Sequence, residues 1–293
     1  MRSFLITLVA LVLVVSPGAF AQSTASGETS AAERIAYGSD PEQYGELRLP
    51  AGRGPFPVAI LLHGGCFIAE MFSATGFSAF ADSLRHAGIA TWNVEYRRVN
   101  SPGGGWPETF RDVGRAADHV RALATRYPLD TTRTIAVGHS AGGFLALWLG
   151  GRRGIAPGAE LHSPDPMPLR AVVALGADGD LPPIAATLAR LCRRPVVGEL
   201  LGADSVTANA RRVQANPADM AALAVRQVLV VGDRDVFETP ALRDAYVART
   251  RRKSEVVDVI TIPGASHFDV ADPRSAAWPI VRRVVSALVQ SQQ

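Results

Sequence analysis

Apolar runs rich in β-branched residues alternate along this chain with segments of helical period. The runs that predict strands are residues 58–62, 89–96, 134–137, 171–175, 228–231 and 256–262. The segments that predict helices are residues 77–87, 108–127, 141–149, 241–251 and 275–289. Most of the strands are continuously apolar, as strands buried on both faces must be. The alternation therefore predicts an α/β fold with a mostly parallel central sheet and helices on both faces.

The alternation of predicted strands and helices is interrupted once, between the predicted strands at residues 171–175 and 228–231. This interval is much longer than a single crossover helix requires, and four prolines divide it into short pieces: Pro182, Pro183, Pro195 and Pro217. Long insertions in compact domains are usually functional. We predict a small helical lid at about residues 177–226, and an irregular surface excursion is the alternative.

The first residues have the features of a secretory signal peptide. Arg2 precedes an apolar run at residues 4–15, and the small-residue pattern Ala19-Phe20-Ala21 follows. The run is shorter than the roughly 20 residues that cross a bilayer, so we expect cleavage after Ala21 rather than a stable membrane anchor. The mature protein is then expected to be secreted or periplasmic.

The remaining chain is predicted to have two parts. Residues 22–36 are mostly small and polar without periodicity, which predicts a disordered tether. Residues 37–293 are predicted to form a single domain, because a chain of 293 residues with 47% apolar residues can bury a full core.

The net charge of +3 arises from arginines scattered along the chain, with Lys253 as the single lysine. A scattered charge predicts no nucleic-acid partner. No cluster of histidine, cysteine and carboxylate residues has the spacing of a catalytic metal site, so neither a metal nor another cofactor is predicted.

A G-x-S-x-G pattern at residues 138–142 lies directly after a predicted strand and directly before a predicted helix. In this context the serine sits on a tight turn that projects its hydroxyl away from the sheet, and glycines on either side provide room. The pattern also appears by chance in chains of this length and glycine content, so by itself it is weak evidence. Its context predicts Ser140 as a nucleophile.

A serine hydroxyl needs a base within hydrogen-bond reach and a carboxylate that orients this base. His267 is the predicted base, because it follows the last apolar strand, where the loop returns to the carboxyl edge of the sheet. His139 is expected to point away from the serine hydroxyl. The other histidines lie on other loops or on helix surfaces: His63, His86, His119 and His162.

Two aspartates follow the predicted strand at residues 228–231 and compete to orient the base. We predict Asp235, because Asp233 is better placed to cap the turn through its own backbone. The resulting chain order of Ser140, Asp235 and His267 differs from the orders of the two best-known serine protease folds.

An oxyanion that forms during attack needs preorganised backbone N–H donors. The N–H of Ala141, directly after the nucleophile, is one predicted donor. Gly65 and Cys66 are the others, because the glycine-rich loop at residues 63–66 follows a buried strand and lets the backbone approach a substrate closely. An ordinary strand-to-helix turn is the alternative.

The motifs HGG, EYRR, GHSAGG, GDRD and GASHFD together resemble the esterase branch of the α/β-hydrolase superfamily. The likeness is to feruloyl-esterase-like, hormone-sensitive-lipase-like and kynurenine-formamidase-like families and extends from about Tyr44 to the C-terminus. It implies the α/β-hydrolase fold, a carboxylic ester as substrate, and structural roles for Tyr96, Arg97 and Asp112. Trp106 is a candidate pocket wall or a surface residue, and His139 is a second candidate for the pocket.

Cys66 stands where these families usually have a third glycine. A backbone donor is expected to survive there if the local φ is negative. Cys66 and Cys192 are the two cysteines of the chain, and an oxidising compartment would let them pair. Two separate buried thiols are the alternative.

The expected reaction is ester hydrolysis by a serine hydrolase. Amide cleavage, by a formamidase or a small-peptide hydrolase, would use the same three residues. A non-catalytic binding protein on this fold is the rival from another class, since a fold does not imply a function.

Overall fold

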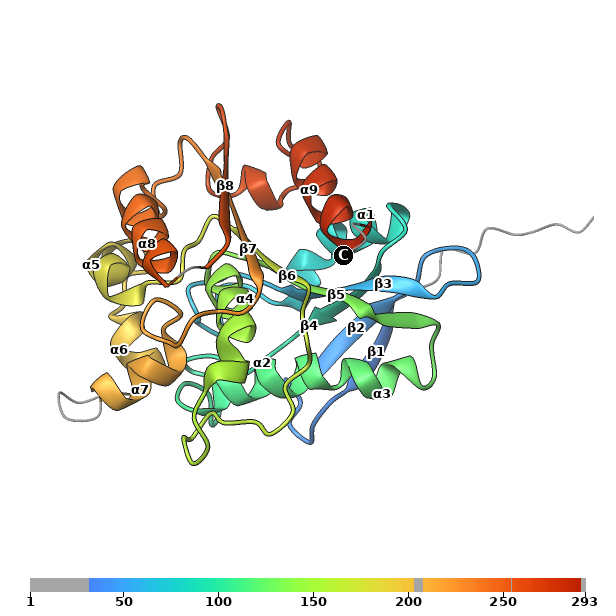
Figure 1. Ribbon diagram of the computed structural model, residues 1–293, viewed down its shortest axis with the longest axis horizontal. Coiled ribbons are helices and arrows are strands. Elements are labelled where there is room, and N and C mark those ends of the chain that lie inside the picture. The colour runs from blue at the N-terminus through green and yellow to red at the C-terminus, as the bar shows by residue number, and fades with distance from the viewer. Residues whose placement is uncertain (1–31, 203–207, 254, 291–293) are drawn as a thin grey trace, which may run out of the picture.

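The computed structural model describes residues 32–202, 208–253 and 255–290. The predicted signal peptide and most of the predicted tether lie outside these ranges. Within them, eight strands form one sheet in the order β1-β2-β4-β3-β5-β6-β7-β8 (Figure 1). The strands are β1 Glu33–Ala36, β2 Tyr44–Arg48, β3 Phe56–Leu62, β4 Ala90–Val94, β5 Leu129–His139, β6 Ala171–Leu175, β7 Arg226–Gly232 and β8 Val257–Ile262.

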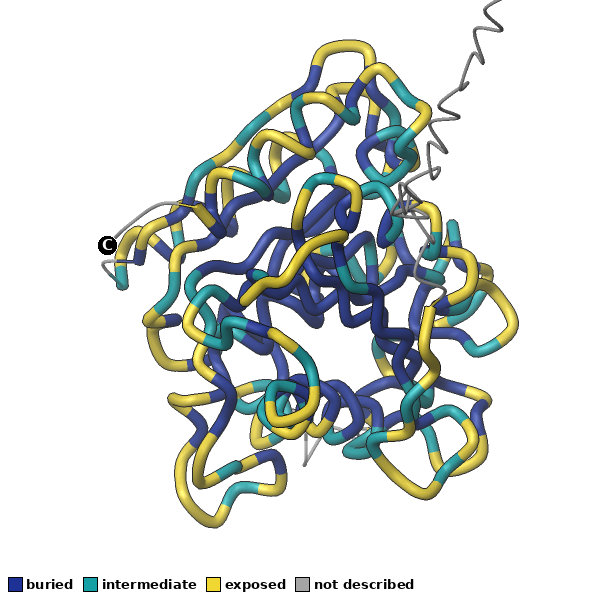
Figure 2. The backbone as a smooth tube through the Cα atoms, turned by 90° about the vertical axis from the view of Figure 1, so that its right-hand side faces the viewer, coloured by how far each residue is buried: buried dark blue, intermediate teal, exposed yellow. Residues whose placement is uncertain are grey.

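Helices cover both faces of the sheet, and each face has its own apolar core. Side chains of α1 and α9 pack in one core, and side chains of α2, α3, α4 and α8 pack in the other. Figure 2 shows the buried strands in the middle of the molecule, inside elements whose outer sides are exposed. These helices are α1 Ser78–His86, α2 Glu108–Asp118, α3 Val120–Ala124, α4 Ala141–Gly151, α8 Pro240–Arg252 and α9 Trp278–Gln290.

The strands from β4 through β3 to β8 pair in parallel. Their register aligns the last residues of neighbouring strands, so that Leu62 pairs with Gly138 and Gly232 pairs with Ile262. The loops that follow β3, β5, β7 and β8 therefore meet at one edge of the sheet. In open α/β sheets ligands bind at this carboxyl edge.

The predicted α/β-hydrolase fold is confirmed by this architecture, but the start of the fold was predicted wrongly. Residues 33–36 form strand β1 instead of part of a tether, and β1 and β2 form an antiparallel edge of the sheet. Neither strand has a continuous apolar run. The residues of β1 are exposed or half-buried, and β2 contains the buried ion pair between Arg48 and Glu46, 2.9 Å apart. The helix predicted at residues 108–127 is divided into α2 and α3.

The long insertion between β6 and β7 contains three helices among its described residues. They are α5 Leu181–Leu191, α6 Val196–Leu201 and α7 Ala208–Ala215. Asn216, after α7, donates to the carboxylate of Asp180 before α5, and Arg249 on α8 also donates to Asp180. These contacts fix the insertion to the body of the domain. Its role as a lid stays a prediction.

None of the described helices combines the length and the apolar character that a membrane-spanning helix needs.

Candidate active site

Ser140 occupies a strained turn between β5 and α4. Its φ of 54° and ψ of −121° lie in a region that non-glycine residues rarely adopt. A Cβ at Gly138 would lie 2.0 Å from the carbonyl oxygen of Gly142, and a Cβ at Gly142 would lie 2.0 Å from that of Leu62. The backbone N–H of Ser140 donates to the carbonyl of Leu175 at 2.9 Å. The two glycines therefore let three segments meet at the nucleophile position.

His267 and Asp235 form a buried pair beside this turn. Nδ1 of His267 lies 2.8 Å from Oδ2 of Asp235. Because a carboxylate accepts hydrogen bonds, Nδ1 carries the proton and Nε2 of the neutral ring is free to accept one. The other carboxylate oxygen accepts the backbone N–H groups of Phe237 and Glu238. Asp235 is thus held on both sides, and the ring of His267 has one orientation relative to it.

Asp233 is not the partner of His267, but its contact differs from the predicted cap of its own turn. Its Oδ1 accepts the backbone N–H of Gly264 at 2.7 Å, in the loop that carries His267. The contact ties the loop after β7 to the loop after β8. Asp233 therefore supports the site without being the histidine's partner.

His139 contacts the backbone of His267. Its Nε2 lies 2.9 Å from the backbone carbonyl oxygen of His267, so Nε2 carries a proton and donates it. Burial, together with the neighbouring His267, lowers the pKa of His139 to about 3. His139 is consequently neutral near pH 7 and acts as a fixed donor.

The predicted oxyanion loop contacts the serine turn directly. A Cβ at Gly64 would lie 3.1 Å from the Cβ of Ser140. Among the described residues, no backbone acceptor takes the N–H of Gly65 or of Cys66. Both N–H groups, with that of Ala141 at the start of α4, are therefore available at the mouth of the site.

The condition set for a backbone donor at Cys66, a negative φ, is not met, although no backbone acceptor takes its N–H among the described residues. Cys66 has a φ of 54° and Phe67 a φ of 59°, so the cysteine keeps the left-handed conformation that a glycine would adopt there. This conformation costs a non-glycine residue about 1 kcal/mol. Contacts beyond the loop must hold it, and the disulfide is one of them.

Cys66 and Cys192 are joined by a disulfide, with their Cα atoms 6.1 Å apart. Cys192 is the residue directly after α5. The bond therefore links the oxyanion loop to the inserted helices, across 126 residues of sequence. The two separate thiols considered as an alternative are excluded.

Buried polar contacts form the base of the oxyanion loop. Nε2 of His63 lies 3.0 Å from Oε1 of Glu95, and the hydroxyl of Tyr96 donates to the backbone carbonyl of His63. Arg97 donates three hydrogen bonds to the buried carboxylate of Asp112, two from its side chain and one from its backbone N–H. The structural roles that the resemblance implied for Tyr96, Arg97 and Asp112 agree with these contacts.

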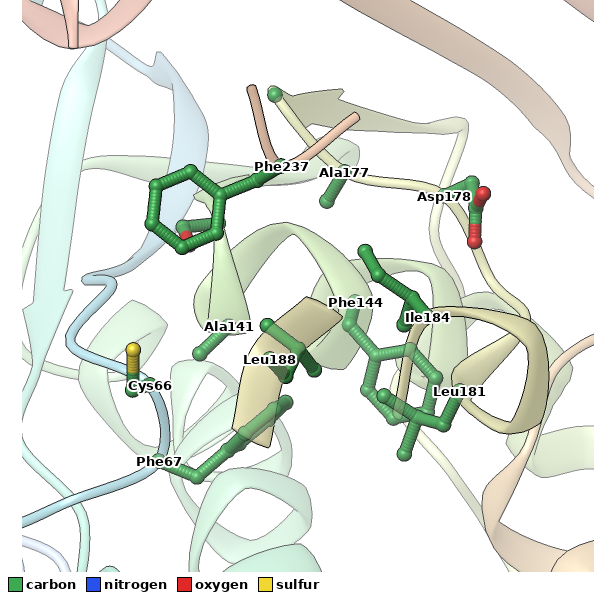
Figure 3. A pocket seen from close by; sticks show the side chains of 12 residues that line it. Cys66, Phe67, Ala141, Phe144, Ala177, Asp178, Leu181, Ile184, Leu188 and Phe237 are labelled. Atoms are coloured by element: carbon green, nitrogen blue, oxygen red, sulfur yellow. The ribbon is translucent and has the colours of Figure 1, made fainter. Parts of the chain in front are cut away.

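Two cavities meet at Ser140. The narrow one has a volume of about 40 Å³ and an apolar lining that includes Phe144, Leu181, Ile184 and Leu188 (Figure 3). The wide one has a volume of about 580 Å³ and is lined by His139, His267 and several aromatic residues: Phe72, Phe77, Phe80, Phe237 and Phe268. Sequence reasoning found His139 but none of these aromatic residues, which come from loops and helices far apart in the chain.

Trp106 lies outside both cavities, contrary to its candidacy as a pocket wall. Its indole N–H donates to Glu160 at 3.1 Å, and the guanidinium of Arg211 lies 5.2 Å from the centre of its ring. The stretch at residues 103–107 leads into α2, whose side chains pack in a different core from those of Ala265 and Val270 beside His267. Trp106 thus packs between α2 and the insertion.

A buried pair of carboxyl groups next to Asp235 was not predicted. Glu238 is 2% exposed, and its carboxyl group shares a hydrogen bond with the buried carboxyl group of Asp178. Burial, with the charges of Asp178 and Asp235, raises the pKa of Glu238 from 4.5 to about 10. Glu238 is therefore protonated near pH 7. In this neutral form it adds no negative charge beside Asp235, the carboxylate that orients His267.

The BD-FAE family model matches residues 46–235, which is more than half of the chain. This chain belongs to the BD-FAE family. The matched region contains the oxyanion loop, Ser140 and Asp235, and it ends before His267. No curated protein matches.

Solved structures similar to this BD-FAE protein share its fold. A carbohydrate esterase from gut microbiota is 17% identical with a TM-score of 0.72, over 90% of this chain and 99% of that one. Esterase B from Lactobacillus rhamnosis is 18% identical with a TM-score of 0.74, over 88% and 85%. An acetyl ester-xyloside bifunctional hydrolase from Caldicellulosiruptor lactoaceticus is 15% identical with a TM-score of 0.68, over 89% and 96%.

Because the carboxyl group of Glu238 is buried, we expect the free energy of unfolding to fall as pH rises. Between the ordinary pKa of 4.5 and the raised pKa near 10, the folded state holds a proton that the unfolded state has lost. Each pH unit in that range costs up to about 1.4 kcal/mol of unfolding free energy. Glu238→Gln, which mimics the protonated form, should stabilise the protein more at about pH 8 than at about pH 5 in urea denaturation.

The matched control is Glu70→Gln. Glu70 is at the surface, and a hydrogen bond from Asn100 lowers its pKa, so its variant should show no larger gain at high pH. An equal effect of Glu238→Gln at both pH values would show that Glu238 ionises normally in the folded protein.

Proposed function

We propose that this protein is a serine esterase that hydrolyses carboxylic esters through an acyl-enzyme on Ser140. The observation that carries the proposal is the buried pair of His267 and Asp235, 2.8 Å apart, on a cavity that Ser140 also lines. The esterases among the similar structures support the class of substrate, a small-molecule ester. No cofactor takes part in the proposed reaction.

The first half of the reaction forms the acyl-enzyme. Nε2 of His267 takes the proton of the Ser140 hydroxyl while Oγ bonds to the carbonyl carbon of the ester. The negative charge moves to the carbonyl oxygen, where the N–H groups of Gly65, Cys66 and Ala141 stabilise it. The bond to the alcohol oxygen then breaks, and His267 gives its proton to that oxygen.

The second half releases the acid. A water molecule enters from the side of the departed alcohol and gives a proton to Nε2 of His267 as its oxygen bonds to the acyl carbon. The bond to Oγ breaks, and Ser140 takes the proton back. During both halves Asp235 stabilises the charged imidazolium, and His139 holds the backbone of His267 in place.

We also propose that the protein is exported. The signal-peptide pattern at residues 1–21 is one support, and the Cys66–Cys192 disulfide is a second, because disulfides persist in oxidising compartments. N-terminal sequencing of the exported protein should find Gln22 as its first residue. A mature chain that still begins at Met1 would contradict this proposal.

Ser140→Ala should lower kcat for p-nitrophenyl acetate by a factor of about 10⁴ or more, because the nucleophile is lost. Asp235→Asn should have a similar effect, because the wrong imidazole tautomer would face the serine. Steady-state hydrolysis at neutral pH measures both.

Ser83→Ala is the matched control, since this hydroxyl lies on α1 and bonds to the backbone of its own helix. It should keep full activity. Turnover that survives in Ser140→Ala would refute the assignment of the nucleophile. Turnover of a matched anilide at a rate similar to the ester would instead favour the amidase alternative.

A further inference from the structure

The two cavities at Ser140 differ in whether His267 lines them. The proposed reaction requires His267 beside the leaving alcohol. His267 lines the wide cavity and is not among the residues that line the narrow one. Cys66, Ser140 and Phe237 line both. In the proposed reaction the alcohol oxygen must receive its proton from His267, so the alcohol lies in the wide cavity. The acyl group, on the other side of the carbonyl carbon, is then directed into the narrow one.

The narrow cavity is small and mostly apolar, with Asp178 as the ionisable residue in its lining. Its volume of about 40 Å³ is much smaller than the 580 Å³ of the wide cavity. Most of its wall is aliphatic or aromatic, and Figure 3 shows Cys66 and Phe67 on one side with Ile184 and Leu181 on the other. Of the two cavities, the narrow one favours a short acyl group such as acetyl or propionyl and offers less room to a long chain or an aromatic ring.

One wall of the narrow cavity is helix α5, which contributes Leu181, Ile184 and Leu188. The Cys66–Cys192 disulfide ties the end of α5 to the oxyanion loop, which forms the opposite wall. At the other end of α5, Asn216 accepts the backbone N–H of Leu181 at 2.9 Å. The helix is therefore fixed at both ends, and it cannot move outward to admit a longer acyl chain without breaking one of these contacts.

The wide cavity suits an apolar alcohol. Its volume of about 580 Å³ is within the size range of small-molecule sites. Phe72 and Phe268 are 40% and 66% exposed at its mouth, and Arg274 also lines it. Exposed aromatic rings of this kind offer contact area to an aromatic or bulky aliphatic group.

We propose that this enzyme is specific for esters of short acyl groups with bulky apolar or aromatic alcohols, and that the Cys66–Cys192 disulfide sets the upper limit of acyl length by holding α5 against the oxyanion loop. This inference rests on the proposed esterase function. It assigns Leu188 and Ile184 as residues that determine acyl specificity, and it gives the disulfide a role in selectivity.

The test is kcat/KM for p-nitrophenyl acetate, butyrate and hexanoate, with the alcohol held constant. The wild type should prefer acetate. Leu188→Ala should raise the ratio of hexanoate to acetate by about 4-fold for each further methylene that it admits, from the usual free energy of methylene burial. Phe268→Ala, at the mouth of the other cavity, is the matched control and should leave this ratio unchanged.

The disulfide is tested by the double variant Cys66→Ala/Cys192→Ala, assayed on the same series. Its hexanoate-to-acetate ratio should rise in the same direction as that of Leu188→Ala. Should this variant fail to fold, mild reduction of the wild type, with loss of the disulfide followed by mass spectrometry, gives the same comparison.

Two results would overturn the inference while leaving the esterase intact. One is equal wild-type turnover of hexanoate and acetate. The other is a Leu188→Ala variant that changes the dependence on the alcohol, measured with ethyl and naphthyl acetate, but not the dependence on acyl length. Absence of turnover for every ester would instead refute the proposed function, and the inference with it.

Discussion

The tight turn at Ser140 is the constraint on which the site depends. Its backbone conformation is unfavourable for a serine, and it persists because β5, α4 and the loop after β3 pack against it. Glycines at positions 138, 142 and 64 permit contacts that a Cβ would block. The turn aims the hydroxyl at the carboxyl edge of the sheet, where the parallel register brings the loops with Asp235 and His267.

Most of the parallel sheet followed from the sequence, because strands buried on both faces must be apolar and so are visible as continuous runs. The same reasoning placed Ser140, Asp235 and His267 in loops that the structure brings to one edge. Strands β1 and β2 were missed for the complementary reason. The residues of β1 are exposed or half-buried, and in β2 the charged pair Glu46 and Arg48 alternates with the buried Gly45 and Leu47, so neither strand shows a continuous apolar run.

The walls of the cavities were not visible in the sequence, because their side chains come from separate elements whose relative positions depend on tertiary packing. Trp106 followed a glycine-rich stretch that resembled a pocket loop, yet it packs against Phe110 and the insertion. The φ of Cys66 is positive, a value that the sequence left open, and its bond to Cys192 connects the loop at residues 63–66 with the end of α5. A pair of cysteines 126 residues apart carries no sign of this proximity.

The central claim is that Ser140 is the nucleophile and that His267 activates it. The most direct measurement is covalent labelling by a p-nitrophenyl alkylphosphonate with a short alkyl group, followed by peptide mapping in the wild type and in His267→Ala. The account predicts one label per chain, on the peptide that contains Ser140, and labelling that is slowed by orders of magnitude in the variant. A label on another residue, or equally fast labelling without His267, would contradict it.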